Sequence, residues 1–205
     1  MIAIIDYGVG NLFSLKSSFA AIGADTVVTG DPAVIRGADK LVLPGVGAFG
    51  DAAALLRRNR LDQLVREETA SGKPLLGICL GMQLLFDYSL EYGRHQGLGL
   101  IPGSVRPIRD YIPAAYKTPH IGWNALRFPA GQPVSPLFRH IREGACVYFV
   151  HSFCAAECEP HVIASAEYGA ELTAAAAREN VYGVQFHPEK SGDAGLHILR
   201  AFCEL

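Results

Sequence analysis

Short apolar runs alternate with amphipathic stretches along the first half of the chain. Each run is apolar throughout, as expected of a strand buried on both faces of a sheet. These runs lie at residues 2–5, 26–28, 41–43 and 75–78. Between them, apolar spacings of three and four from Leu12 to Ile22 predict a helix, and further helices are predicted through Leu55 and over residues 61–70. The alternation predicts an α/β fold whose mostly parallel sheet is covered by helices on both faces.

The pattern changes after Leu98, where segments become short and turn-forming glycine and proline become frequent. This change predicts a β-rich excursion from the α/β fold. Further apolar segments follow at residues 148–150, 162–164 and 183–186. A last helix is predicted with these residues facing inward: Leu196, Leu199 and Phe202. Since no linker or internal repeat interrupts the chain, we expect residues 1–205 to form a single domain.

Composition and charge exclude several classes of function. The 205 residues are 50% hydrophobic and 19% charged, which indicates a globular protein. A net charge of −2 without a Lys/Arg stripe makes nucleic acid an unexpected partner. No apolar run approaches the roughly 18 residues of a membrane span, so no membrane association is expected. The N-terminal segment lacks a basic flank and is predicted as a strand rather than a signal peptide.

The cysteines indicate a reducing environment. Their number is odd, and no C-x-x-C pair occurs. We therefore predict neither a disulfide framework nor a zinc ribbon, and we expect a cytoplasmic location. The five cysteines are Cys79, Cys146, Cys154, Cys158 and Cys203.

One cysteine lies in the stretch Lys73–Asp87, which combines an apolar run, a sharp turn and a helical pattern over residues 82–87. The turn, Gly77-Ile78-Cys79-Leu80-Gly81, matches a nucleophile elbow with cysteine in place of serine. A thiol at the first turn of a helix lies in the positive end of the helix dipole, which favours thiolate. By itself, the motif is equally compatible with a buried structural cysteine in a tight turn.

His187-Pro188-Glu189 supplies the other groups that a cysteine nucleophile needs. Histidine can take a proton and return it near neutral pH, and a third group usually holds its ring. Proline bars a helix between the two residues, and Glu189 can reach the imidazole nitrogen that faces away from the thiol. Alone, the tripeptide is also compatible with a surface turn. Combined with the elbow at Cys79, it predicts a Cys-His-Glu triad.

Three loops are expected on one rim, because ligands bind at the carboxyl ends of parallel strands. The loops are Gly8–Asn11, Pro44–Phe49 and the turn at Cys79, and Asn11 is expected to cap the helix after it. Acyl transfer also requires oxyanion donors. The N–H of Leu80 and the glycine-flanked 44–47 loop are candidates, with an ordinary strand-end turn as the alternative for the loop. His151 follows a strand and fits either a site residue or a hydrogen-bonded rim residue.

Together these motifs resemble the class I, triad-type glutamine amidotransferases, whose fold is a flavodoxin-like three-layer sandwich. The resemblance rests first on the elbow through Gln83 and on Gly183-Val184-Gln185-Phe186-His187-Pro188-Glu189. Further motifs are similar to those of the glutaminase subunits of imidazole glycerol phosphate synthase, from histidine biosynthesis. They are Asp6-Tyr7-Gly8-Val9-Gly10-Asn11, Pro44-Gly45-Val46-Gly47-Ala48-Phe49, Pro119-His120-Ile121-Gly122-Trp123-Asn124, Tyr148-Phe149-Val150-His151-Ser152 and His187-Pro188-Glu189-Lys190-Ser191.

The resemblance implies hydrolysis of glutamine to glutamate and ammonia, with no cofactor and no metal. Cys79 would attack the side-chain amide and form a γ-glutamyl thioester. His187 would protonate the departing ammonia and then activate water, while Glu189 would orient the imidazole. The surrounding groups would be Gln83, Ser152 and Phe153 for substrate binding, and Gly45, Val46 and Leu80 for the oxyanion hole.

The resemblance also implies a heterodimer with a TIM-barrel cyclase subunit. Ammonia would pass into the cyclase and combine with its nucleotide substrate, giving imidazole glycerol phosphate and aminoimidazole carboxamide ribotide. The partner would switch the glutaminase on, since a glycine-flanked peptide such as Gly45–Val46 can flip at low steric cost. Asn11, Trp123 and Lys190 are predicted at or near this interface.

The same residues allow three other interpretations. The nearest is the glutaminase subunit of pyridoxal phosphate synthase or of an anthranilate-type synthase, which the G-W-N and H-P-E-K-S motifs disfavour. A catalytically silent flavodoxin-like scaffold is disfavoured by the intact Cys79, His187 and Glu189. A cysteine hydrolase of peptides or esters is a third, weaker alternative.

Overall fold

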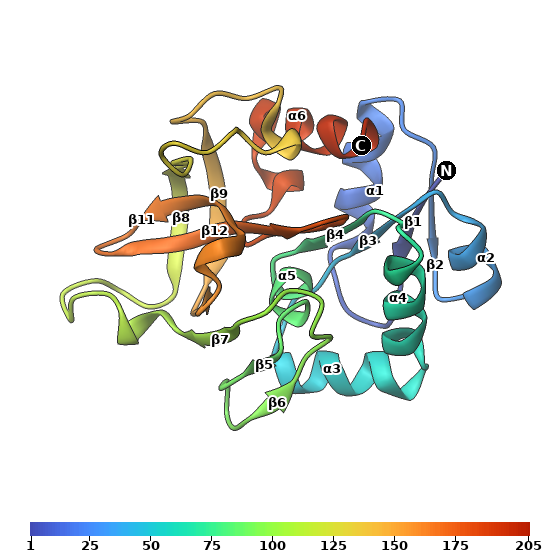
Figure 1. Ribbon diagram of the computed structural model, residues 1–205, viewed down its shortest axis with the longest axis horizontal. Coiled ribbons are helices and arrows are strands. Elements are labelled where there is room, and N and C mark those ends of the chain that lie inside the picture. Colours follow the sequence, from blue (N-terminus) through green and yellow to red (C-terminus); the bar gives the residue numbers. More distant parts are fainter.

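The computed structural model describes residues 1–205 and is organised around a seven-stranded sheet (Figure 1). Its five parallel strands are, in spatial order, β13 (Val181–Val184), β4 (Leu75–Ile78), β3 (Lys40–Leu43), β1 (Ile2–Ile5) and β2 (Thr26–Thr29). Antiparallel pairing extends the sheet beyond β13 through β12 (Glu171–Arg178) and β11 (Val162–Glu167). The mostly parallel sheet expected from the sequence is confirmed.

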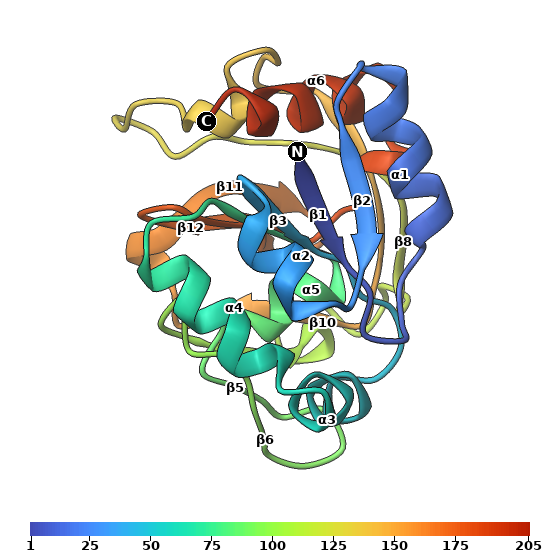
Figure 2. The same cartoon turned by 90° about the vertical axis from the view of Figure 1, so that its right-hand side faces the viewer.

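Helices cover both faces of this sheet, as Figure 2 shows. One face carries α1 (Leu12–Ala21) and α6 (Gly192–Cys203), and the other carries α2 (Pro32–Gly37), α3 (Phe49–Arg58), α4 (Leu61–Ala70) and α5 (Leu80–Leu84). The strand period of two divides the apolar residues between two cores. On β1, for example, Ala3 and Ile5 join the core under α2–α5, whereas Ile2 and Ile4 join the core under α1 and α6. The sandwich therefore has three layers.

Two smaller sheets form the β-rich part of the chain. The first has four strands: β5 (Tyr88–Ser89), β6 (His95–Gln96), β7 (Ser104–Pro107) and β10 (Phe153–Ala156). The second has two, β8 (His120–Ala125) and β9 (Cys146–His151), which stand beside the edge of the main sheet in Figure 1. Short 3-10 helices occur at Ile108–Asp110, Pro136–Phe138, Glu159–His161 and Pro188–Lys190. The excursion thus begins at β5, ten residues before the point suggested by the sequence pattern.

The helix after the elbow is shorter and begins earlier than predicted. The pattern predicted residues 82–87, whereas α5 spans Leu80–Leu84. Its end has a physical cause, because the carbonyl of Leu84 accepts the N–H of Leu98 at 2.7 Å. The segment after β6 therefore takes a backbone acceptor that a longer helix would have used.

The structure differs from the sequence prediction in two further elements, α2 and β12, and in the burial of one side chain, Leu196. Helix α2 and strand β12 were not predicted, although Asp31 caps α2 by accepting the N–H of Ala33 at 2.8 Å. In α6, Leu199 and Phe202 are buried as expected, but Leu196 is only half-buried.

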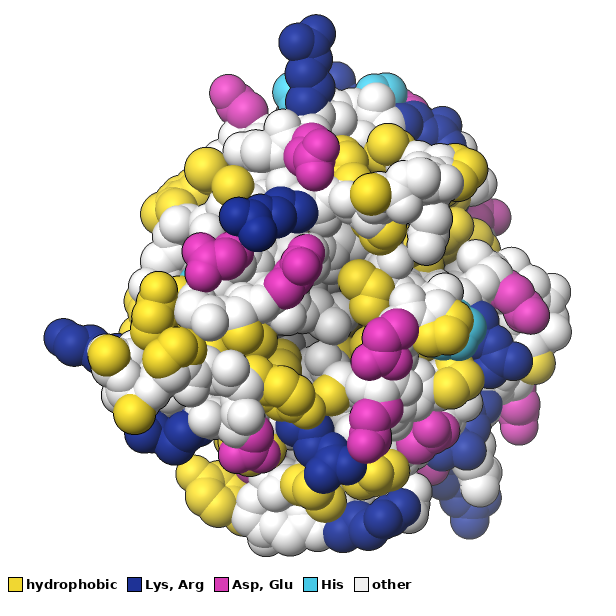
Figure 3. Space-filling view, turned by 60° about the vertical axis from the view of Figure 1, so that its left-hand side comes forward, with side chains coloured by type: hydrophobic (Ala, Val, Ile, Leu, Met, Phe, Trp, Pro, Cys, Tyr) yellow, Lys and Arg dark blue, Asp and Glu magenta, His cyan; other side chains and the backbone are white.

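The surface mixes charges of both signs. On the face in Figure 3, Lys and Arg side chains are interspersed with Asp, Glu and exposed hydrophobic ones. All five cysteines are free thiols. No helix combines the length and apolar character that crossing a bilayer requires, and no cluster of three or more His, Cys, Asp or Glu side chains is arranged to hold a metal ion.

Candidate active site

The elbow predicted around Cys79 is present between β4 and α5. Cys79 adopts φ 55° and ψ −113°, a left-handed backbone conformation that few non-glycine residues adopt. Two glycines allow strand and helix to meet there. A Cβ on Gly77 would lie 2.7 Å from the carbonyl oxygen of Gly81, and a Cβ on Gly81 would overlap the carbonyl oxygen of Leu43. Such strain persists only where the surrounding structure holds it, and it concentrates at functional sites.

The loop after β3 packs directly on this elbow. The hydroxyl of Tyr7 donates to the carbonyl of Pro44 at 2.8 Å, and burial raises the pKa of Tyr7, so it stays a neutral donor. A Cβ on Gly45 would lie 2.8 Å from both the Gly81 nitrogen and the Tyr7 hydroxyl. Within the loop, Gly45 is therefore buried against the elbow, while Val46 is 42% exposed. The tertiary structure thus holds the 44–47 loop next to the elbow that carries Cys79.

His187 and Glu189 meet as the sequence predicted. His187 Nδ1 lies 2.8 Å from Glu189 Oε1, and both side chains are buried. Since a carboxylate accepts, Nδ1 carries the proton and Nε2 is left to face Cys79. Burial alone would lower the pKa of His187, but hydrogen bonding and charge interactions with Cys79 and Glu189 outweigh it and raise the pKa to about 9. The imidazole is therefore held protonated beside the sulfur.

The backbone of His187 is anchored on both sides. Its N–H donates to the Tyr148 carbonyl of β9 at 2.9 Å, and its carbonyl accepts the Ser191 hydroxyl at 2.6 Å. The same hydroxyl accepts the N–H of Tyr148 at 3.0 Å. These bonds tie the end of the main sheet to β9, so the position of His187 depends on the β-rich excursion.

Two glutamine side chains form an amide network beside Cys79. Gln83 Nε2 donates to the Phe153 carbonyl at 3.2 Å and to Gln185 Oε1 at 3.0 Å. Gln185 Nε2 in turn lies 3.8 Å from Cys79 Sγ. Nothing local in the sequence marks Gln185, a glutamine between two apolar residues, as part of a site.

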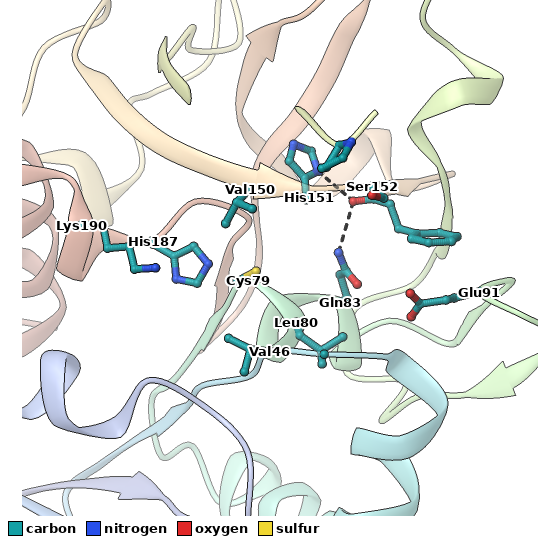
Figure 4. Close-up of a pocket in the computed structure, with 13 residues that line it drawn as sticks. Val46, Cys79, Leu80, Gln83, Glu91, Val150, His151, Ser152, His187 and Lys190 are labelled. Atoms are coloured by element: carbon teal, nitrogen blue, oxygen red, sulfur yellow. Dashed lines mark hydrogen bonds between the residues drawn. The ribbon is translucent and has the colours of Figure 1, made fainter. Parts of the chain in front are cut away.

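Several of these groups line a pocket of about 420 Å³ (Figure 4). In this view Cys79 lies between His187 and Gln83. The predicted site residues that line it are Val46, Cys79, Leu80, Gln83, Ser152, Phe153, His187 and Lys190. Gly45 and Glu189 do not line it, because Gly45 is packed under the elbow and Glu189 holds the imidazole.

The pocket also contains residues that the sequence analysis did not select. They are Glu91, Pro119 and Val150, whereas Gly47, which also lines the pocket, belongs to the predicted 44–47 loop. Glu91, on the turn between β5 and β6, is held by the N–H of Phe49, which donates to its Oε2 at 2.6 Å. No sequence signal marks this carboxylate, since it reaches the pocket only through the packing of the β5–β6 hairpin.

The two alternatives for His151 are both correct. It lines the pocket, and it is also hydrogen-bonded, to His120 and to the carbonyl of Phe153.

Two of the three predicted interface residues share one aromatic neighbour, Tyr148. Trp123 is 57% exposed and packs edge-on against Tyr148, with ring centroids 6.1 Å apart. Lys190 Nζ lies 5.9 Å from the centroid of the same Tyr148 ring. Asn11 occupies the N-cap position of α1, but its side chain makes no capping hydrogen bond, contrary to the sequence expectation.

Residues 3–204 match the family model described as glutamine amidotransferase class-I. The chain belongs to the class-I glutamine amidotransferase family. Relatives in this family include imidazole glycerol phosphate synthase subunit HisH of Oceanobacillus iheyensis, which is 45% identical over 206 residues, covering 100% of this chain and 99% of that one. HisH of Methanothermobacter thermautotrophicus is 49% identical over 208 residues, covering 100% and 98%. This amidotransferase is therefore an enzyme subunit of the imidazole glycerol phosphate synthase type, which confirms the family expected from the sequence and implies a partner subunit.

Solved structures show the same fold at lower identity. A crystal structure of a glutamine amidotransferase has a TM-score of 0.75 at 18% identity, covering 99% of this chain and 100% of that one. PurLQS from Thermotoga maritima has a TM-score of 0.74 at 18% identity, covering 99% and 97%. The class I amidotransferase fold expected from the sequence is confirmed for this amidotransferase.

Proposed function

We propose that residues 1–205 act as one glutamine amidotransferase domain that hydrolyses glutamine and passes the ammonia to a cyclase subunit in histidine biosynthesis. The observation that carries the proposal is the buried His187–Glu189 pair beside a cysteine on a strained elbow, at the bottom of a pocket. We place the reaction in the cytoplasm, which is supported by five cysteines that form no disulfide.

In the acylation step, Cys79 Sγ attacks the side-chain amide carbon of glutamine. The new C–S bond forms as the carbonyl π electrons move to oxygen. When this tetrahedral intermediate collapses, the C–N bond breaks and His187 Nε2 gives its proton to the departing nitrogen, which leaves as ammonia. His187 then takes a proton from water, which attacks the thioester and releases glutamate and the Cys79 thiolate. Glu189 holds the ring through Nδ1 in both steps.

Two groups beside Cys79 are suited to stabilise the oxyanion. The N–H of Leu80 is in the first turn of α5, where backbone donors have no partner within the helix. The peptide joining Gly45 to Val46 lies in the loop packed on the elbow, next to the pocket-lining Gly47, whose φ is 98°. A flip in this loop would complete or dismantle the oxyanion hole at low cost.

The far end of the pocket suits the charged end of glutamine. The carboxylate of Glu91 complements an α-ammonium group. The backbone at Ser152 and Phe153 lines this part of the pocket, and the N–H of Phe153 suits the α-carboxylate. The amide of Gln83 contacts the pocket from α5, with its nitrogen already committed to protein acceptors. Substrate would thus be held at both ends.

Transfer to a partner follows from the chemistry of ammonia. Released into water, ammonia is protonated to ammonium and loses its nucleophilic lone pair, so a sheltered route preserves it. We propose that the TIM-barrel cyclase covers the rim near Trp123, Lys190 and Asn11, and that it activates the glutaminase through the exposed Val46 loop.

The test is glutamate release from glutamine by this chain, with and without the cyclase and its nucleotide substrate. We expect near-zero release from the chain alone and an increase of about 10²-fold or more with the complete partner, which corresponds to about 3 kcal/mol. Release that is robust and unaffected by the cyclase would contradict partner activation while leaving the hydrolysis intact. No release under any condition would contradict the proposed function itself.

A second prediction concerns pH. Because Cys79 and Glu189 raise the pKa of His187 to about 9, the imidazolium that protonates the departing amide nitrogen is present below that pH and lost above it. Thus kcat/KM should fall as pH rises through about 9. In Glu189→Gln one of the groups that raises this pKa is gone, so the alkaline limb should move to lower pH and kcat/KM should fall by about 10²–10⁴-fold.

The α-ammonium group of glutamine titrates in a similar pH range, but its titration affects the wild-type and Glu189→Gln profiles equally. The informative quantity is therefore the displacement between the two profiles, measured as glutamate release in the presence of the cyclase. Superimposable alkaline limbs would refute the role given to Glu189.

A further inference from the structure

The wall of the glutamine pocket includes one of a pair of buried histidines, His120 and His151, that the reaction does not use. His120 on β8 and His151 on β9 stand opposite each other in the antiparallel register, and they are 3% and 6% exposed. His120 Nδ1 lies 2.9 Å from His151 Nε2, and His151 Nδ1 lies 2.8 Å from the carbonyl oxygen of Phe153. The His120 ring is stacked on Phe149 and on Tyr168.

These contacts form a row of hydrogen bonds that ends at the Phe153 carbonyl, and this acceptor determines which imidazole nitrogens carry the protons. A carbonyl oxygen only accepts, so His151 must donate through Nδ1–H. Burial lowers the pKa of both histidines to about 4, so both are neutral at pH 7. A neutral imidazole protonated at Nδ1 has an unprotonated Nε2. His120 must therefore donate to His151 through its own Nδ1–H.

The carbonyl at the end of this row of hydrogen bonds belongs to Phe153, a residue of the substrate pocket. Phe153 faces Pro107 in the β10–β7 register, while the carbonyl of the preceding Ser152 accepts the N–H of Ile108 at 2.9 Å. In an antiparallel ladder the N–H and C=O of one residue point to the same side. The Phe153 N–H therefore lies on the side where its carbonyl meets His151 and Gln83, toward the pocket.

We infer that His120 is a positioning residue for glutamine binding: by donating to His151, it selects the tautomer that holds the Phe153 peptide in place against the substrate. Without this donor, His151 Nε2 becomes a buried acceptor with no partner. A shift of its proton to Nε2 would then release the Phe153 carbonyl. The Phe153 peptide would then lose the hydrogen bond that fixes it. Gln83, which donates to the same carbonyl, would lose a fixed acceptor. The inference rests on the proposed function, because it assigns these groups to the glutamine site.

Two substitutions separate hydrogen bonding from packing. His120→Phe keeps an aromatic ring for the contacts with Phe149 and Tyr168 but removes the donor. His120→Asn removes the ring but keeps an N–H near the place of Nδ1. A merely structural role predicts that Phe is tolerated and Asn is harmful, whereas the positioning role predicts the reverse.

The readout is alkylation of Cys79 by a chloroketone analogue of glutamine, compared with iodoacetamide, which needs no amino-acid pocket. In His120→Phe we expect the half-saturating analogue concentration to rise about tenfold, the size expected for one lost buried hydrogen bond. The rate with iodoacetamide should stay within about twofold. In the complex with the cyclase, the KM for glutamine should rise similarly while kcat changes little. His120→Asn should recover to within about threefold of wild type.

Wild-type saturation by the analogue in His120→Phe, or equal impairment of the two variants, would overturn the inference. Should His120→Phe fail to fold, ¹⁵N spectra of the wild-type histidines decide instead. We expect His151 and His120 both protonated at Nδ1, and a proton on His151 Nε2 would overturn the inference. Failure of the proposed function shows separately, as a wild-type chain that the glutamine analogue labels no better than iodoacetamide does.

Discussion

Replacing Cys79 by alanine is expected to lower cyclase-stimulated glutamate release by about 10⁴-fold or more, to near the rate without enzyme. Loss of a nucleophile in a cooperating triad removes covalent catalysis entirely, because His187 and Glu189 then have no group to activate. The measurement is glutamate release at saturating glutamine, with the partner and its nucleotide present. Release of ammonia-derived product by the cyclase should fall in parallel.

Cys146→Ala serves as the matched control, since Cys146 is an exposed free thiol on β9 outside the pocket. It should retain activity within about twofold of wild type, because isolated surface substitutions change little. Added ammonium salts should still support the cyclase reaction with Cys79→Ala, which would show that the partner remains folded. Substantial glutamine hydrolysis by Cys79→Ala would refute the assignment of the nucleophile.

Gly81→Ala is expected to destabilise the fold by about 2–4 kcal/mol, because the added Cβ would overlap the backbone carbonyl of Leu43. Backbone cannot rotate away as a flexible side chain can, so α5 must move off β3 and carry Cys79 with it. For a chain of this size the melting temperature should fall by about 5–15 °C. Activity should be lost even below the melting temperature, since the oxyanion donor at Leu80 shifts as well.

Gly37→Ala is the control for this prediction. Gly37 ends helix α2, and a Cβ there would meet nothing within 4 Å. Its melting temperature should stay within about 2 °C of wild type. Thermal unfolding followed by circular dichroism compares the two variants. A Gly81→Ala chain with wild-type melting temperature and activity would show that the close packing of elbow and loop is not required.

The elements that follow local rules agree between sequence and structure. The apolar run, sharp turn and glycines around Cys79 place strand, elbow and helix within a few residues, so their geometry is encoded locally. The same holds for His187 and Glu189, because one intervening proline lets the carboxylate reach the ring at 2.8 Å. Helix α4 matches its predicted bounds, since its apolar periodicity and its Gly-Lys-Pro end are both local signals.

Other elements departed from local expectation. Strand β12 contains four consecutive alanines, and alanine is the best helix former. It is nevertheless a strand, because β11 and β13 flank it and pair with it on both sides. Helix α5 ends early for a related reason, as a distant segment takes its backbone acceptors. In both cases tertiary hydrogen bonding outweighs propensity.

The family, the layered α/β fold and the choice of Cys79, His187 and Glu189 as the candidate triad could all be predicted from the sequence, because strand and helix periods and tight turns depend on neighbouring residues. The groups around the sulfur could be found only in the folded molecule. Gln83 meets Gln185 across 102 positions and Phe153 across 70, while Glu91 and the His120–His151 pair reach the site through the β-rich excursion. Contacts of this kind depend on how separate sheets pack together, and packing leaves no local pattern in the chain.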